Sequence, residues 1–149
     1  MKICFAASSG GHLNEITRLS TLRSKYDHFL ITEGDKENPL YSKTYLLKKT
    51  DRKHLSSMFY FIYLFYDAYS ILHKEKPDYI ICTGAMCTFP FCFVGKLLKI
   101  RIIYIESYAR VNELSLTGKL IYPFADVYFV QWEQLLKRYP KAVYGGGLF

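Results

Sequence analysis

Short apolar runs alternate with amphipathic segments along this chain of 149 residues. The first run, 2–7, ends in Ser-Ser-Gly-Gly, and apolar positions then recur at Leu13, Ile16, Leu19 and Leu22, which predicts a helix. A strand, a glycine turn and a helix in this order are the start of a βαβ unit. The same pattern predicts further strands over 28–32, 43–49, 77–82, 101–105, 126–130 and 142–144, a polar loop over 33–39, and helices over 55–72, 89–98, 114–122 and 132–138.

Strands that alternate with helices indicate an α/β fold, a Rossmann-like doubly wound and mostly parallel sheet. The length suits one domain, which we place at 1–144 and which leaves 145–149 as a C-terminal tail. Ligands of such sheets bind beyond the carboxyl ends of the strands. Three loops are expected to meet there: 8–12, 83–88 and 106–110.

The segment 55–72 is almost entirely apolar and aromatic. Its length is marginal against the roughly 20 residues that a membrane span needs, and Asp67 and several tyrosines argue against a span. Its polar end before Pro77 is typical of an ordinary helix stop. Two interpretations stay open: a buried crossover helix, or a helix with one face on the sheet and the other on a membrane surface.

Composition narrows the classes of partner. The formal net charge is +7, which suits nucleic acid, anionic lipid or a phosphorylated substrate. There is no long basic run, arginine-rich helix or zinc-finger spacing, so we expect no nucleic-acid partner. Four cysteines form no CxxC pair, and the chain begins directly with a strand, so we expect no signal peptide and a cytoplasmic protein with reduced thiols.

The turn after the first strand is the strongest candidate binding site. Gly10 and Gly11 let the backbone approach a ligand closely, and the following helix start presents free N–H groups that suit a phosphate. Ser8 and Ser9 add hydroxyl donors. The alternative is a plain tight turn with a serine cap.

Four more residues are candidates for the same crevice. His12 has a pKa suited to a general base, although it can instead cap the helix or only contact the ligand. Glu106 follows a strand and is expected to bind a sugar hydroxyl or to orient His12. Thr83 and Gly84 form either a ligand loop or a normal strand–helix turn, and Arg110 either contacts phosphate or pairs with a nearby glutamate.

Three motifs together resemble a known protein group over essentially the whole chain. They are Ser-Ser-Gly-Gly-His at 8–12, Lys-Pro-Asp-Tyr-Ile-Ile-Cys-Thr-Gly at 76–84 and Ile-Glu-Ser-Tyr-Ala-Arg-Val at 105–111. The group is the acceptor-side subunit of two-part GT-B glycosyltransferases. It includes the membrane-anchor subunit of the dolichol-pathway UDP-N-acetylglucosamine transferase and the bacterial PssD- and CpsF-like proteins of capsule and exopolysaccharide synthesis.

The resemblance implies the N-terminal half of a MurG-like GT-B enzyme, with the UDP-sugar bound by a separate polypeptide. The chain is then expected to bind a lipid-diphosphate-linked saccharide, to recruit that donor-binding subunit, and to be inactive alone. It also implies a bacterial polysaccharide setting. In this reaction we expect His12 to accept the proton of the acceptor hydroxyl, or to help position that hydroxyl, with support from Glu106. We expect no metal or other cofactor, because the chain has no Asp-x-Asp motif and helix ends can meet the charge of a diphosphate. The alternative is a non-catalytic scaffold that stimulates an independently active transferase.

Membrane and partner contacts are expected at two further places. The eukaryotic relative begins with a membrane-spanning helix, whereas Met1 here opens the first strand, so we expect peripheral contact with the anionic inner face of the cell membrane. The apolar tip of the tail suits docking to the partner subunit. The expected membrane residues are Lys48, Lys49, Arg52, Lys53, Phe59 and Phe61, and the expected docking residues are Gly147, Leu148 and Phe149.

Overall fold

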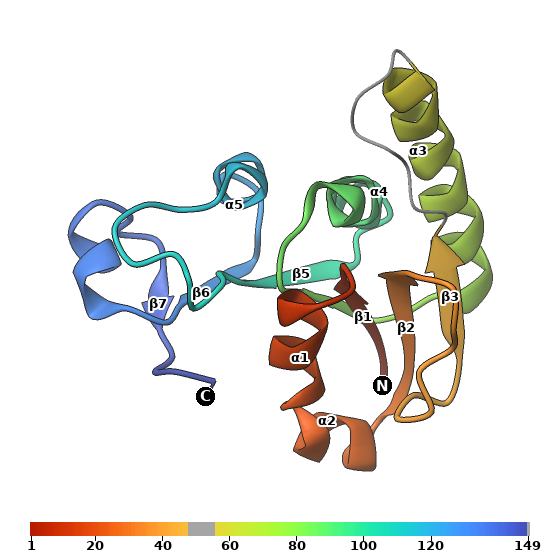
Figure 1. Cartoon of the computed structure of the whole chain (residues 1–149), viewed down its shortest axis with the longest axis horizontal. Coiled ribbons are helices and arrows are strands. Elements are labelled where there is room, and N and C mark those ends of the chain that lie inside the picture. Colours follow the sequence, from red (N-terminus) through yellow and green to blue (C-terminus); the bar gives the residue numbers. More distant parts are fainter. Residues whose placement is uncertain (48–55, 149) are drawn as a thin grey trace.

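The computed structural model describes residues 1–47 and 56–148, and within them seven parallel strands form one sheet (Figure 1). The strand order is β3-β2-β1-β4-β5-β6-β7, and every neighbouring pair is parallel. The strands are β1 Lys2–Ala7, β2 Asp27–Glu33, β3 Thr44–Leu47, β4 Tyr79–Cys82, β5 Arg101–Ile105, β6 Val127–Val130 and β7 Val143–Tyr144.

Helices cover both faces of the sheet, as Figure 1 shows. One face carries α1 (Gly11–Thr17) and α2 (Ser20–Lys25); the other carries α3 (Ser56–Glu75), α4 (Phe89–Leu97) and α5 (Leu116–Ile121). Two 3-10 segments, η1 (Met86–Thr88) and η2 (Glu133–Lys137), complete the connections. The predicted doubly wound α/β fold is therefore confirmed.

Alternation along β1 explains why its sequence is apolar from Ile3 to Ala7. Cys4 and Ala6 belong to the core beneath α3 and α4, whereas Ile3, Phe5 and Ala7 belong to the core beneath α1. Successive side chains of a strand point to opposite faces, and both faces are covered here. All five side chains are consequently buried.

The helix predicted after the first turn is in fact two helices. Apolar positions spaced by three residues drift by about 60° per step around an α-helix, so Leu13 and Leu22 cannot share one face of a straight helix. The chain breaks at Arg18 and Leu19, which restores contact with the sheet. The Arg23 guanidinium donates to the Thr17 carbonyl oxygen at 2.6 Å and stabilises the end of α1.

The aromatic segment predicted from the sequence forms α3, with a buried and an exposed side. Leu64, Ala68 and Leu72 are spaced by four residues and are buried against the sheet and α4, so the crossover interpretation is confirmed for this face. Phe59 and Tyr66 on the other side are each 69% exposed. Within the described residues, no helix has both the length and the hydrophobicity that crossing a bilayer requires.

The strand order reverses between β1 and β4, which are neighbours in the sheet although their paired residues, such as Ile3 and Tyr79, are 76 positions apart in the chain. The loops that follow these strands therefore lie side by side. The Thr83 hydroxyl donates to the His12 carbonyl oxygen at 2.9 Å and ties them together. Such a reversal is where doubly wound sheets place their ligands.

Candidate functional site

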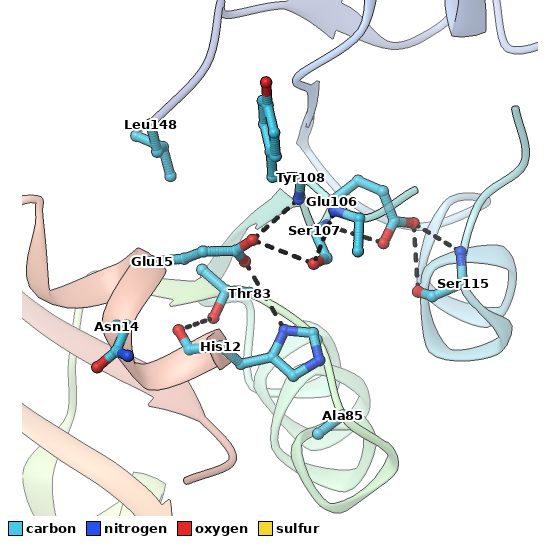
Figure 2. A network of polar contacts seen from close by, with 12 residues as sticks. His12, Asn14, Glu15, Thr83, Ala85, Glu106, Ser107, Tyr108, Ser115 and Leu148 are labelled. Carbon is cyan, nitrogen blue, oxygen red and sulfur yellow. Dashed lines mark hydrogen bonds and ion pairs between the residues drawn. The ribbon is translucent and has the colours of Figure 1, made fainter. Parts of the chain in front are cut away.

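His12 and Glu15 face each other at this reversal. Both lie on α1, three residues apart, and therefore on the same side of the helix. The His12 Nδ1 atom is 3.8 Å from the Glu15 Oε2 atom, as the dashed line in Figure 2 shows. The Glu15 side chain is only 4% exposed, so its carboxylate is enclosed.

Each partner leaves one buried polar atom unsatisfied within the described part of the chain. His12 Nδ1 and Glu15 Oε2 have no hydrogen bond there, and 3.8 Å is longer than a hydrogen bond but within reach of an ion pair. The interaction with the Glu15 carboxylate raises the pKa of His12 above its usual value of 6.5, and burial opposes this only in part. The pair is thus built to stabilise a positive charge on the imidazole.

The second nitrogen of the imidazole, Nε2, lies on the side of the ring away from Glu15 (Figure 2). The His12 side chain is 30% exposed, although its Nδ1 atom is buried. A carboxylate at Nδ1, with Nε2 turned away from it, is the arrangement by which histidine acts as a general base. Such contacts are often long before substrate binds.

The Thr83–Gly84 loop holds the other side of the ring. Gly84 has a φ of 107°, and a β-carbon there would lie 2.9 Å from His12 Cε1. Ala85 follows with a φ of 71°, a conformation that L-residues seldom adopt. The Thr88 hydroxyl donates within this loop, at 2.9 Å from the Gly84 carbonyl oxygen and 2.7 Å from that of Ala85. The loop is therefore shaped around His12.

Glu106 has a different place from the one expected. Its carboxylate is fully buried and accepts four hydrogen bonds: from Ser107 N, Ser115 N, Ser115 Oγ and the Tyr128 hydroxyl, at 2.8–3.2 Å. These contacts aim it toward α5 and β6, whereas Glu15 takes the position beside His12 (Figure 2). The expectation that Glu106 orients His12 directly is thus corrected.

The remaining predicted ligand residues are spread around the turn. Ser9, Gly10 and Gly11 are exposed, whereas Ser8 is buried. Gly10 is the N-cap of α1 and no side chain caps that end, so the serine-cap alternative is not what the structure has. Arg110 is exposed, and the described contacts of the Glu113 carboxylate go to Lys119 and Arg138.

The predicted membrane and docking residues are only partly described. Phe59 is exposed, whereas Phe61 is half-buried and stacks on Phe89. In the tail, Gly147 is exposed and the Leu148 N–H donates to Gln131 Oε1 at 2.8 Å. Five predicted residues lie outside the described ranges: Lys48, Lys49, Arg52, Lys53 and Phe149.

Sequence reasoning missed Glu15. One signal was available, because Glu15 follows His12 by three residues and immediately precedes the buried Ile16. A carboxylate on the inner side of a helix, next to a histidine, is a candidate partner for that histidine.

As to metals, no group of three His, Cys, Asp or Glu side chains within 1–47 and 56–148 is placed to hold an ion.

Comparison with known proteins places this chain in a family. The family profile described as "Oligosaccharide biosynthesis protein Alg14 like" matches residues 47–148. A rat protein named UDP-N-acetylglucosamine transferase subunit ALG14 is 32% identical over 175 residues, covering 97% of this chain and 81% of its own. The Yarrowia lipolytica protein of the same name is 34% identical over 145 residues, covering 93% and 64%.

Solved structures share the fold at low identity. The crystal structure of Acinetobacter baumannii MurG superposes with a TM-score of 0.70 at 13% identity, over 90% of this chain and 43% of that one. The Neisseria meningitidis UDP-GlcNAc 2-epimerase bound to UDP-GlcNAc gives 0.73 at 12% identity, over 99% and 47%. This chain thus spans less than half the length of those proteins. The profile match and the identity to the rat and yeast proteins show that the chain belongs to the Alg14-like family.

Proposed function

We propose that this chain is the acceptor-side subunit of a UDP-N-acetylglucosamine transferase and works only with a separate donor-binding subunit. The names of its relatives, which are transferase subunits, support this. The observation that carries the proposal is the enclosed His12–Glu15 pair at the reversal of the strand order.

In the proposed reaction, a hydroxyl of the lipid-linked saccharide attacks the anomeric carbon of the donor sugar. The bond between that carbon and the UDP oxygen breaks, and UDP leaves with the electron pair. The hydroxyl proton passes to His12 Nε2, and Glu15 stabilises the imidazolium that forms. The turn at 8–11, of which residues 9–11 are exposed, is proposed to contact the phosphate or sugar of the acceptor.

The expected biological setting, bacterial capsule or exopolysaccharide synthesis, is a separate question from the expected reaction. The relatives described above are eukaryotic subunits, so they lend no support to a capsule or exopolysaccharide setting. That setting stays a prediction from the resemblance. The sugar class in the names of the relatives, N-acetylglucosamine, is the one we propose here.

The test is the activity of the co-expressed subunit pair. We expect His12→Ala to lower kcat by about 10²–10⁴, which is the usual contribution of a general base. The matched control is His73→Ala, because His73 is exposed at the end of α3 and stacks only on Tyr69 among the described rings. Wild-type turnover by His12→Ala removes the base from the proposal. Full activity of the donor subunit alone favours the scaffold alternative instead.

We propose the tail as part of the contact with the donor subunit. Gly145 N–H donates to the Val130 carbonyl oxygen at 3.1 Å, and Leu148 packs against the apolar cluster on the α1 side of the sheet. Leu148→Asp is expected to weaken co-purification of the partner at least tenfold by placing a charge on this apolar contact. Leu116→Asp, on the opposite face and 65% exposed, is the control. Equal recovery of partner with both variants contradicts the docking role.

We further propose that the outer side of α3 contacts an anionic membrane surface. Phe59, Ile62 and Tyr66 are 61–69% exposed on one side of the helix, and aromatic side chains are favoured at the headgroup level. Flotation with phosphatidylserine vesicles is expected to fail for Phe59→Ser/Tyr66→Ser. Tyr144→Ser, another exposed tyrosine, is expected to float normally. The variant Lys48/Lys49/Arg52/Lys53→Glu tests the contribution that we predict for these basic residues. Unchanged flotation of both this variant and Phe59→Ser/Tyr66→Ser contradicts the proposed membrane contact.

A further inference from the structure

Ser107 bridges two buried carboxylates that come from opposite halves of the chain. Its N–H donates to Glu106 Oε1 at 3.0 Å, and its hydroxyl donates to Glu15 Oε1 at 3.1 Å (Figure 2). We propose that Ser107 is a positioning residue that fixes the Glu15 carboxylate so that its second oxygen faces His12. The catalytic consequence rests on the function proposed above, but the positioning itself does not.

Glu106 supplies the rigid end of this bridge. Its side chain has no exposed area, and its four donors come from two loop residues and from β6. The Gln131 side chain also donates to the Glu106 carbonyl oxygen at 3.0 Å, so the backbone that leads into Ser107 is held as well. A buried carboxylate with this many donors is costly to disturb, which makes it a fixed reference point.

Glu15 receives the other end of the bridge through a single oxygen. Oε1 accepts both the Ser107 hydroxyl and the Tyr108 N–H, the latter at 2.9 Å. Oε2 is left facing His12 Nδ1 with no hydrogen bond among the described residues. The terminal torsion of glutamate is broad and roughly two-fold, so it is set by such contacts. Two donors on one oxygen therefore decide where the other oxygen points.

The hydroxyl of Ser107 is itself oriented. Its oxygen accepts the Ala109 N–H at 3.4 Å, which leaves the hydroxyl hydrogen for Glu15. Besides Glu15, the titratable group whose charge acts on His12 is Cys82, which belongs to β4 and not to this loop. The Tyr104 hydroxyl of β5 lies on the same side, 3.3 Å from the β-carbon position of Gly84. A change at Ser107 thus reaches His12 through Glu15.

The first test is an NMR titration of His12 in this chain alone, which needs neither partner nor substrate. Ser107→Ala is expected to lower the pKa of His12 toward 6.5, because Glu15 Oε2 is no longer held against Nδ1. Ser107→Thr keeps the hydroxyl and is expected to restore the wild-type value. An unchanged pKa in Ser107→Ala overturns the proposal. A pKa that rises also overturns it, because the serine would then compete with His12 for the carboxylate.

Ser115→Ala is the matched control. Its hydroxyl also donates to a buried glutamate, at 3.2 Å from Glu106 Oε2, and it caps α5 by accepting the Gly118 N–H at 2.9 Å. This variant is expected to lower Tm and to leave the pKa of His12 unchanged. An equal fall of the pKa in both serine variants overturns the proposal, since general loosening of the loop would then explain it.

The second test uses the co-expressed pair. Ser107→Ala is expected to lower kcat about tenfold with little change in KM, the usual effect of losing a group that orients a reacting one. Failure of the function proposed above gives a different result, because His12→Ala would then be fully active. The titration of His12 in the wild-type chain and in Ser107→Ala would still test the positioning by Ser107. A fall in kcat without a shift of the His12 pKa counts against the bridge.

Discussion

Gly84 lies so close to His12 that a β-carbon on it would be 2.9 Å from Cε1 and 3.2 Å from Nδ1 of the imidazole. The backbone of the loop at 83–88 thus packs directly against the imidazole ring of His12. The φ of 107° at Gly84 is itself one that glycine adopts readily and other residues do not. A single glycine therefore serves both the turn after β4 and the position of His12.

Gly84→Ala is expected to displace the ring and to destabilise the fold. Backbone strain at a positive φ costs about 1–3 kcal/mol, and the contact with His12 adds to it. Gly10→Ala is the control, because Gly10 has a φ of 92° but nothing within 4 Å of its β-carbon position. Chemical denaturation should show a loss in both variants, whereas the NMR signals of His12 should move in Gly84→Ala only. Unchanged His12 signals in Gly84→Ala contradict the claim that the Gly84 backbone positions the ring.

The pH dependence of transfer should report the His12–Glu15 pair. A general base works in its neutral form, so kcat/KM is expected to rise with pH through the His12 pKa, which Glu15 holds above 6.5. Glu15→Gln removes the negative charge and is expected to move this acidic limb to lower pH while lowering the plateau. An acidic limb that stays in place in Glu15→Gln shows that another group titrates there.

Glu75 should make the fold resistant to acid. Its side chain is 8% exposed and accepts hydrogen bonds of 2.5 Å from Lys2, Lys43 and Tyr45, so it joins α3 to β1 and to the segment containing β3. Burial opposes its ionisation, but these three donors outweigh burial and lower the pKa of Glu75 to about 2.

The pKa of Glu75 is lower in the folded chain than in the unfolded chain, so its contribution is complete above about pH 4.5 and is lost as the pH falls toward 2. The shift corresponds to about 3 kcal/mol. Glu75→Gln is expected to lose this amount at pH 7 and to show a flatter loss of stability between pH 4.5 and 2. Denaturant titrations across this range test it, and parallel curves for both proteins contradict it.

Gly118 should tolerate no side chain. A β-carbon there would overlap Glu106 Oε2 and the Tyr128 hydroxyl, both of which are buried and hydrogen-bonded to each other. Gly118→Ala is expected to cost about 1–3 kcal/mol through overpacking. Gly11→Ala, also in a helix but with open space around its β-carbon position, should be neutral or slightly stabilising. Equal stabilities in thermal denaturation contradict the packing around Glu106.

Periodicity and turn residues predicted the sheet, its covering helices and the convergence of the loops at 8–12 and 83–88. These features depend on local hydrophobic patterns and on the right-handed crossover between parallel strands, and both rules are general for α/β folds. The roles of Glu15 and Glu106 could not be read in the same way. Which of two carboxylates lies beside His12 depends on the register of β5 against β4 and on the loop after β5, and neither leaves a local pattern.

The central place of β1 has a consequence for the order in which the protein can form during synthesis. Its first edge can pair with β2 early, but its second edge has no partner until Tyr79–Cys82 has left the ribosome. The unpaired N–H and C=O groups of a strand edge can form hydrogen bonds with other chains, which leads to aggregation. Glu15 receives its donors later still, when Ser107 and Tyr108 emerge. The nascent chain therefore carries a bare strand edge and an incomplete site through much of its translation.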